Sequence, residues 1–146
     1  MNKEVFQLIY LSSANYEFSQ EELLQILEKS RKNNTALNIT GILLYEERNI
    51  IQLLEGDRKR VESLFKVIQN DQRHSGIICL IRDFKEKRDF PEWSMGFQRL
   101  KHGKFESELV GFNKLVEKKS IIDEDMKNLS SAVKVLIKSF TRSIRS

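Results

Sequence analysis

The sequence contains very little cysteine, histidine or proline. Among its 146 residues are one cysteine, two histidines and one proline. The single Cys79 excludes an intramolecular disulfide bond and a zinc cluster of several cysteines. His74 and His102 are too few to suggest a dedicated transition-metal site. We therefore expect neither a disulfide framework nor metal chemistry.

Long apolar segments are also lacking. No run approaches the ~18 consecutive apolar residues that are typical of a membrane-spanning helix. The first residues, MNKEVFQLIY, lack the apolar stretch and the small-residue cleavage site of a signal peptide. The sequence thus predicts a cytoplasmic protein without a membrane span.

The charged residues are distributed unevenly along the chain. Residues 1–96 carry 14 Lys and Arg against 15 Asp and Glu, whereas residues 97–146 carry 11 against 6. The basic excess therefore lies in the C-terminal part. Such a segment is compatible with an acidic protein or a nucleic acid, although a solvated helix face is the simpler interpretation. Because nothing in it resembles a helix-turn-helix or an aromatic-rich RNA surface, we expect no nucleic-acid partner.

The first 98 residues alternate between strand and helix patterns. Ser19 and Glu22 form a capping box before one helical segment, and Asp57 can cap the other. We expect strands at about 5–11, 39–45, 50–55, 77–84 and 93–100, and helices at about 20–33 and 58–71.

This order, βαββαββ, predicts a ferredoxin-like α+β domain, with one mixed sheet covered on one face by two helices. In the segment 77–84, strict alternation places Cys79 on the same face as Ile77 and Ile81. Core packing then explains the cysteine.

The pattern changes after Leu100, and we expect a C-terminal helical pair at about 108–118 and 124–142. The second segment has apolar residues at steps of three and four: Met126, Leu129, Val133, Leu136, Ile137 and Phe140. We therefore divide the chain into a domain at 1–98 and a helical extension at 99–146. An apolar stripe of this length needs a cover, which the free sheet face, the preceding helix or a second subunit could provide.

Polar side chains interrupt the apolar strands. Gln52 lies in the middle of the run IIQLL, where an unpaired amide would cost about 1–3 kcal/mol. Tyr10 brings a phenol to the face of the first strand that also carries Phe6 and Leu8. Two interpretations are open: an internal Tyr–Gln hydrogen bond that fixes strand register, or a site for a flat apolar ring with a polar edge. The adjacent Asn33 and Asn34 could likewise cap the first helix or contribute amides to that site.

Several motifs, taken in order, resemble the BLUF family, sensors of blue light using FAD. The resemblance covers about residues 3–98. Its intervals are 24 residues from Tyr10 to Asn34, 18 from Asn34 to Gln52 and 43 from Gln52 to Met95. The motifs are LIY ending at Tyr10, the Asn33-Asn34 pair, ITGILLY at 39–45, QLLEG at 52–56, DQRH at 71–74 and FPEWSM at 90–95.

The resemblance implies a light reaction carried by hydrogen bonds around non-covalently bound FAD. Tyr10 would give an electron and a proton to the excited flavin, and Gln52 would relay the proton and rearrange its hydrogen bonds. One or the other of Trp93 and Met95 would lie near Gln52 on a strand that shifts during signalling. Which of the two faces the flavin stays open, and core packing could explain both.

The resemblance also implies binding residues. Asn34, with its neighbour Asn33, would hold the pyrimidine edge of the flavin, and Arg73 and His74 would approach the FAD phosphates. The alternative for the last two is a solvated loop. Asn33 replaces a histidine found in some members, and Ile50 replaces a common aromatic residue, so flavin packing or dark recovery could differ.

Two functions from different classes remain at this point. The first is a blue-light photoreceptor that acts on an unidentified partner protein or through a homo-oligomer. The second is a flavin-free ferredoxin-like interaction or assembly module with a basic tail. Since the sequence lacks phosphate-binding, nucleophile-elbow, zinc-protease and dinucleotide-binding motifs, we expect no enzymatic activity in either case. A yellow colour of the purified protein would favour the first.

Overall fold

The computed structural model describes residues 5–91, 94–101 and 104–105. Its elements follow the predicted order βαββαββ, with one further short strand at the end. They are β1 Val5–Ala14, α1 Gln20–Leu37, β2 Thr40–Glu46, β3 Asn49–Gly56, α2 Arg58–Gln69, β4 His74–Lys85, β5 Gly96–Lys101 and β6 Lys104–Phe105.

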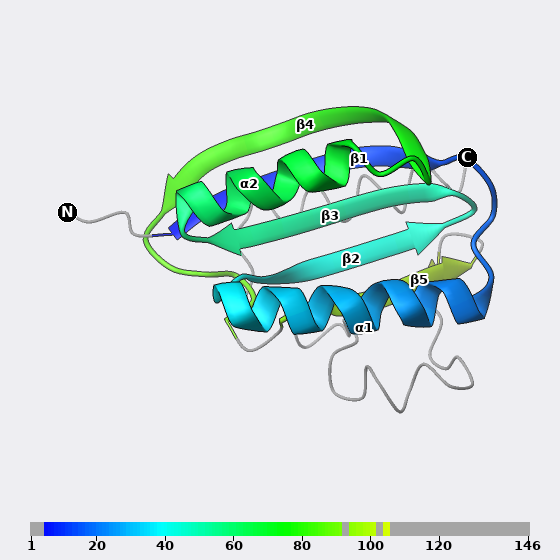
Figure 1. Ribbon diagram of the computed structural model, residues 1–146, viewed down its shortest axis with the longest axis horizontal. Coiled ribbons are helices and arrows are strands. Elements are labelled where there is room, and N and C mark those ends of the chain that lie inside the picture. Colours follow the sequence, from blue (N-terminus) through cyan, green and yellow to red (C-terminus); the bar gives the residue numbers. More distant parts are fainter. Residues whose placement is uncertain (1–4, 92–93, 102–103, 106–146) are drawn as a thin grey trace.

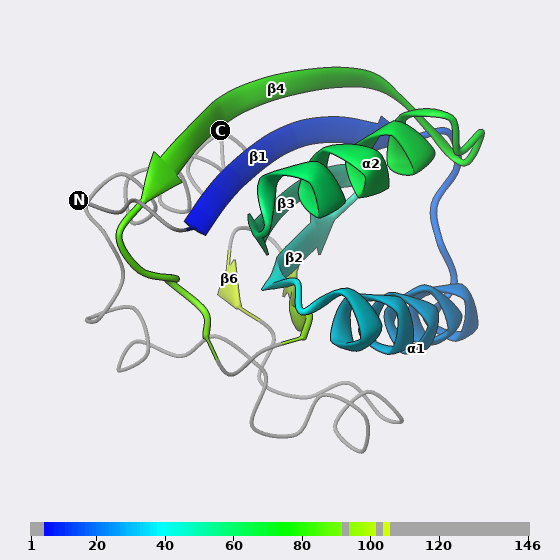
Figure 2. The same ribbon diagram turned by 60° about the vertical axis from the view of Figure 1, so that its left-hand side comes forward.

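The strands form one mixed sheet in the order β4-β1-β3-β2-β5-β6. The neighbouring strands are antiparallel except β2 and β5, which are parallel. Both helices lie on the same face of this sheet, with α2 across β1 and β3 and α1 on the β2 side (Figures 1 and 2). The α+β ferredoxin-like sheet with two helices is confirmed.

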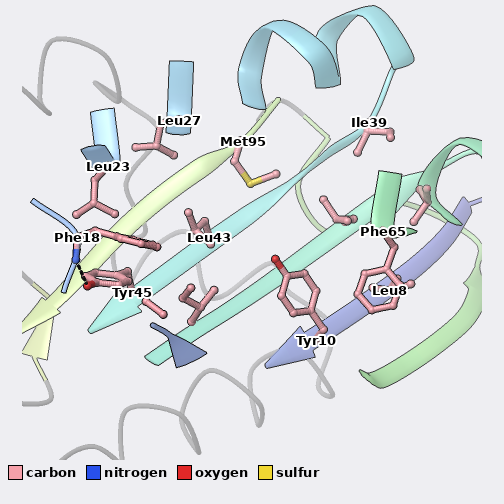
Figure 3. Close-up of a cluster of buried hydrophobic side chains, with 14 of the residues drawn as sticks. Leu8, Tyr10, Phe18, Leu23, Leu27, Ile39, Leu43, Tyr45, Phe65 and Met95 are labelled. Carbon is pink, nitrogen blue, oxygen red and sulfur yellow. Dashed lines mark hydrogen bonds between the residues drawn. The ribbon is translucent and has the colours of Figure 1, made fainter. Parts of the chain in front are cut away.

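A continuous apolar core lies between each helix and the sheet (Figure 3). Leu8 and Tyr10 from β1 meet Phe65 from α2, whereas Leu23 and Leu27 from α1 cover the other side. The opposite face of the sheet is buried too, through the alternate residues of the central strands: Ile9, Ile42, Leu44, Ile51 and Leu53. Both faces of the central strands therefore contribute to folding stability.

Both helix starts agree with the sequence. Ser19 and Glu22 form the reciprocal capping box, and Asp57 accepts a hydrogen bond from the Arg60 backbone N–H. The end of α1 differs, because the helix continues to Leu37 and Asn38 closes it in the left-handed conformation. The prediction that α1 ends near residue 33 is wrong. Asn33 and Asn34 consequently lie on the helix, and their capping interpretation is wrong as well.

The prediction that Cys79 is a core residue is also wrong, since its side chain is exposed. β4 is an edge strand, and α2 covers β1 and β3 rather than β4 itself. A bulge at Leu80 further breaks the alternation, because Cys79 pairs with Tyr10 whereas Ile81 pairs with Ile9. Cys79 and Ile81 therefore face opposite sides of the sheet.

Some expectations lie outside the described residues. Trp93 and both helices predicted at 108–118 and 124–142 belong to this group. Among the described helices, neither is long and apolar enough to cross a membrane.

The pairing of β2 with β3 leads to a prediction about Gly41. A Cβ atom at Gly41 would lie 1.8 Å from the backbone oxygen of Leu53, so a larger residue must push the strands apart. We expect Gly41→Ala to lower the free energy of unfolding by at least about 3 kcal/mol. Gly76→Ala is the matched control, because its Cβ would meet nothing within 4 Å.

The control Gly76→Ala should lower the free energy of unfolding by about 1 kcal/mol, because the positive φ of Gly76 is unfavourable for alanine. Urea denaturation followed by circular dichroism measures both variants. Equal losses would contradict the close approach at Gly41.

Candidate functional site

A cavity of about 410 Å³ opens between the two helices above the sheet. Ile26 from α1 and Leu64 from α2 form apolar walls, and Tyr10, Leu43 and Gln52 from the sheet line its floor. Its volume falls within the range of small-molecule sites, and it combines apolar walls with a few convergent polar groups. It is therefore the candidate functional site.

Tyr10 and Gln52 meet on the floor of this cavity. They are direct partners in the antiparallel pairing of β1 with β3. Their side chains are 3% and 7% exposed, and the Tyr10 hydroxyl donates a hydrogen bond to Gln52 Oε1. The two buried polar groups thus satisfy each other, as one of the two interpretations of the sequence predicted.

The other end of the Gln52 amide contacts Met95. Nε2 of Gln52 donates to the Met95 sulfur over 3.5 Å, and Met95 is fully buried at 0% exposure. Of the two residues Trp93 and Met95, the structure places Met95 beside the glutamine, while Trp93 lies outside the described residues. Since one amide end faces a phenol and the other a thioether, turning the amide would change both contacts.

Burial keeps the phenol of Tyr10 neutral. Burial raises the pKa of Tyr10 well above its ordinary value, and the charge of Asp71 raises it further. The rings of Phe65 and His74 lie 5.4 and 6.2 Å from the Tyr10 ring. The folded protein therefore holds a protonated phenol whose proton points at an amide oxygen.

The two asparagines from α1 also line the cavity, but they differ in burial. Asn34 is buried, and its Nδ2 donates to the Ser94 carbonyl over 2.8 Å. Asn33 is exposed at the rim. Asn34 consequently connects the cavity wall to the chain segment that leads to Met95.

Arg73 and His74 lie at the rim, each engaged by protein groups. The Arg73 guanidinium binds Asp71 through Nε at 2.9 Å and Nη2 at 2.5 Å, and this pairing lowers the pKa of Asp71 to about 2. His74 Nε2 donates to the Ile68 carbonyl at 2.6 Å, while Nδ1 lies 2.8 Å from Ser12 Oγ. An anion at this rim would therefore share Arg73 with Asp71.

The sequence interpretation missed two residues near the cavity. Tyr45 lines it, donates to Glu17 over 2.7 Å and stacks on Phe18. Arg31 lies outside the lining, and its Nε donates to the Met95 carbonyl over 2.9 Å. Helical spacing offered a signal for Arg31, because residues three apart share a helix face and Asn34 was already a candidate.

The cavity fits the flat, mostly apolar ring of a flavin. Its walls are aliphatic, and Gln52 and Asn34 place side-chain amides beside its apolar space. The one cysteine of the chain, Cys79, is absent from the lining and exposed on β4. The residues therefore fit a flavin held by packing and hydrogen bonds, without a thioether link.

The buried phenols lead to a prediction for alkaline pH. Burial raises the pKa of Tyr10, and burial with the bond to Glu17 raises that of Tyr45 to about 12. Both phenols bind their protons more tightly in the folded state, so this stabilisation is complete below the unfolded pKa of about 10 and is lost as pH rises above it.

We expect the urea midpoint to stay level from about pH 7 to 9.5 and to fall between about pH 10 and 12. Tyr10→Phe should flatten this fall, whereas Tyr16→Phe, at an exposed side chain, should preserve most of it. An identical fall in both variants would show that the buried phenol does not contribute.

The chain matches a family model, and several relatives are known. The model, BLUF, "Sensors of blue-light using FAD", matches residues 5–96. The photoactivated adenylate cyclase subunit beta of Euglena longa is 32% identical over 89 residues, which is 60% of this chain and 10% of the relative. The blue light- and temperature-regulated antirepressor BluF of Escherichia coli K12 is 30% identical over 88 residues, covering 60% of this chain and 22% of BluF.

Solved structures agree with this assignment. The dark-state structure of BlrB, a BLUF protein, superposes with a TM-score of 0.65 at 28% identity, over 96% of this chain and 97% of BlrB. Because the family is defined by its use of FAD, the flavin-free alternative is not supported. The chain therefore belongs to the BLUF family: its matched segment is a flavin-dependent blue-light sensor domain rather than an enzyme domain.

Proposed function

We propose that this protein is a blue-light photoreceptor whose photochemical pair is Tyr10 and Gln52. The observation that carries the proposal is the buried hydrogen bond from the Tyr10 hydroxyl to Gln52 Oε1, on the floor of the cavity. Tyr10 is a neutral phenol with its proton already directed at an acceptor. Loss of an electron and a proton from Tyr10 therefore needs no prior rearrangement of the protein.

FAD, when bound, supplies an electron acceptor that blue light excites. Tyr10 would give up one electron to that acceptor and pass its hydroxyl proton to Oε1 of Gln52, and Nε2 of the same amide would release a proton in turn, so that Gln52 stays neutral. Return of both the electron and the proton restores the phenol, so the cycle leaves Tyr10 unchanged. Between these steps the amide of Gln52 can rotate or tautomerise, which exchanges the positions of its donor and its acceptor.

Rotation of the amide would be felt at Met95. In the dark, Nε2 of Gln52 donates to the Met95 sulfur. If the amide oxygen took that place, two acceptors would face each other and this contact would be lost. The segment that carries Met95 leads directly into β5, which begins at Gly96. We propose that this segment carries the signal out of the cavity.

The binding roles follow from the positions around the cavity. Asn34, and Asn33 at the rim, would hydrogen-bond the pyrimidine edge of the ring, opposite the contacts of Gln52. Arg73 and His74 would lie toward the phosphates. Because both ring nitrogens of His74 have protein partners, we assign the stronger phosphate contact to Arg73.

Substitutions of the photochemical pair should separate binding from switching. We expect Tyr10→Phe and Gln52→Leu to retain FAD, because the cavity keeps nearly its size, and to lose the small red shift of flavin absorption under blue light. Tyr16→Phe is the control, since Tyr16 is exposed and outside the cavity lining. Difference spectra before and after illumination measure the outcome. A normal red shift in either cavity variant would refute the assignment.

Substitutions at the rim should change FAD affinity in opposite directions. Arg73→Ala removes the proposed phosphate contact and should raise the dissociation constant about tenfold. Asp71→Asn removes the competing carboxylate and should lower it. Arg58→Ala is the control, because Arg58 pairs with Glu62 outside the cavity lining. Flavin fluorescence during titration measures all three, and an unchanged affinity in Arg73→Ala would remove the phosphate role.

We further propose that the chain after β6, residues 106–146, forms the helical extension that was expected from residue 99 on, and that it covers the second face of the sheet and supports self-association. Residues 99–101 and 104–105 are strand. Two observations support this proposal. Ile9, Ile42 and Leu53 on that face are buried, although neither described helix lies over it. The match with BlrB spans 96% of this chain and therefore continues past residue 98. The FAD-binding domain expected at 1–98 would then extend through β5 and β6 to Phe105.

The output would reach a second protein. The Escherichia coli relative is named an antirepressor, which by its name acts on another protein. We propose that this protein likewise signals to a protein partner, through the segment after Met95 and through its oligomeric state. A cytoplasmic location accords with such a role.

A further inference from the structure

The chain around Met95 is held on α1 by two side chains. Arg31 Nε donates to the Met95 carbonyl over 2.9 Å, and Asn34 Nδ2 donates to the Ser94 carbonyl over 2.8 Å. The two donors are three residues apart, so they lie on one face of α1. Because the Arg31 bond carries a positive charge in a partly buried position, it is stronger than a neutral hydrogen bond.

The chain that leads to this segment is fixed on the other side. The Glu55 carboxylate accepts from the backbone N–H groups of Asp89 and Phe90 over 3.0 and 2.6 Å. Arg88 donates to Thr40 Oγ1 and to the Asn38 carbonyl, both over 2.8 Å. The approach to Met95 is therefore attached to β2, β3 and the end of α1.

These contacts determine where movement of Met95 can go. The side chain of Met95 contacts Gln52, whereas its carbonyl contacts Arg31. With residues 88–90 fixed, a change at Gln52 can displace the Met95 backbone only against the bond to Arg31 and the bond from Asn34 to the preceding Ser94. Arg31 therefore opposes the displacement that the switch would drive.

We propose that Arg31 is a positioning residue that holds the Met95 backbone on α1 and thereby sets the dark position of β5. Its link to signalling rests on the proposed function, whereas its hold on Met95 does not. Arg31 lies outside the cavity lining and would act through the Met95 backbone rather than on the flavin.

Amide hydrogen exchange of the FAD-loaded protein in darkness tests the hold. In Arg31→Gln, the amide hydrogens of residues 94–101 should exchange about tenfold faster than in the parent protein, because a charge-assisted hydrogen bond is lost. Illumination should then add little further exchange there. Arg31→Lys keeps a cationic donor, so its exchange rates should lie between those of Arg31→Gln and those of the parent protein. If Arg31→Gln fails to fold, the lysine variant carries the comparison, with an expected increase of a few fold.

Arg48→Gln is the matched control. Arg48 Nε donates to the Ala14 carbonyl over 3.0 Å in a similarly part-buried position, away from Met95. In Arg48→Gln, the exchange rates of the amide hydrogens of residues 94–101 should equal those of the parent protein. Equal rates for Arg31→Gln and Arg48→Gln in darkness would overturn the proposal.

Failure of this inference can be distinguished from failure of the proposed function. A parent protein that binds FAD and gives no red shift would refute the photochemical assignment, while the dark comparison would still decide the role of Arg31. A normal photocycle with unaltered dark exchange in Arg31→Gln would overturn the role of Arg31 and leave the photochemical assignment standing.

Discussion

The hydrogen bond between Tyr10 and Gln52 depends on the antiparallel pairing of β1 with β3. These strands are separated along the chain by α1 and β2, so the whole βαββ unit must fold before the two side chains meet. The same register directs both side chains toward the helices, because paired residues share a face of a sheet. A register shift of one residue would turn the side chain of the shifted strand to the opposite face, so that Tyr10 and Gln52 would each lose their hydrogen-bond partner.

The sequence predicted much of the fold because its signals were local. The capping box at Ser19 and Glu22 set the start of α1, and alternation set the central strands. The errors lie where tertiary structure decides. Asn38 in the left-handed conformation extends α1 beyond the asparagine pair, and a bulge at Leu80 breaks the alternation of β4. Neither feature has a reliable signal in a single sequence.

The residues of the candidate site were likewise predictable only where the signal was local. Tyr10 and Gln52 stood out as polar residues in apolar strands, and the structure joins them. The family resemblance, rather than pattern alone, selected Asn34, Arg73 and His74. The contacts of the last two with Asp71 and Ile68 depend on how the turn after α2 closes, which no spacing reveals. Arg31 escaped notice because a lysine or arginine on an amphipathic helix usually indicates only a solvated face.

The bulge in β4 also affects how the protein behaves at high concentration. β4 is a long edge strand, and Ile78, Leu80 and Phe84 are 58%, 39% and 37% exposed. A flat apolar edge of this kind would recruit strands from other molecules and favour aggregation. The bulge bends the strand and interrupts its regular row of backbone groups, while Arg82 adds charge beside it. An irregularity that misleads sequence interpretation can thus help to keep the protein dispersed.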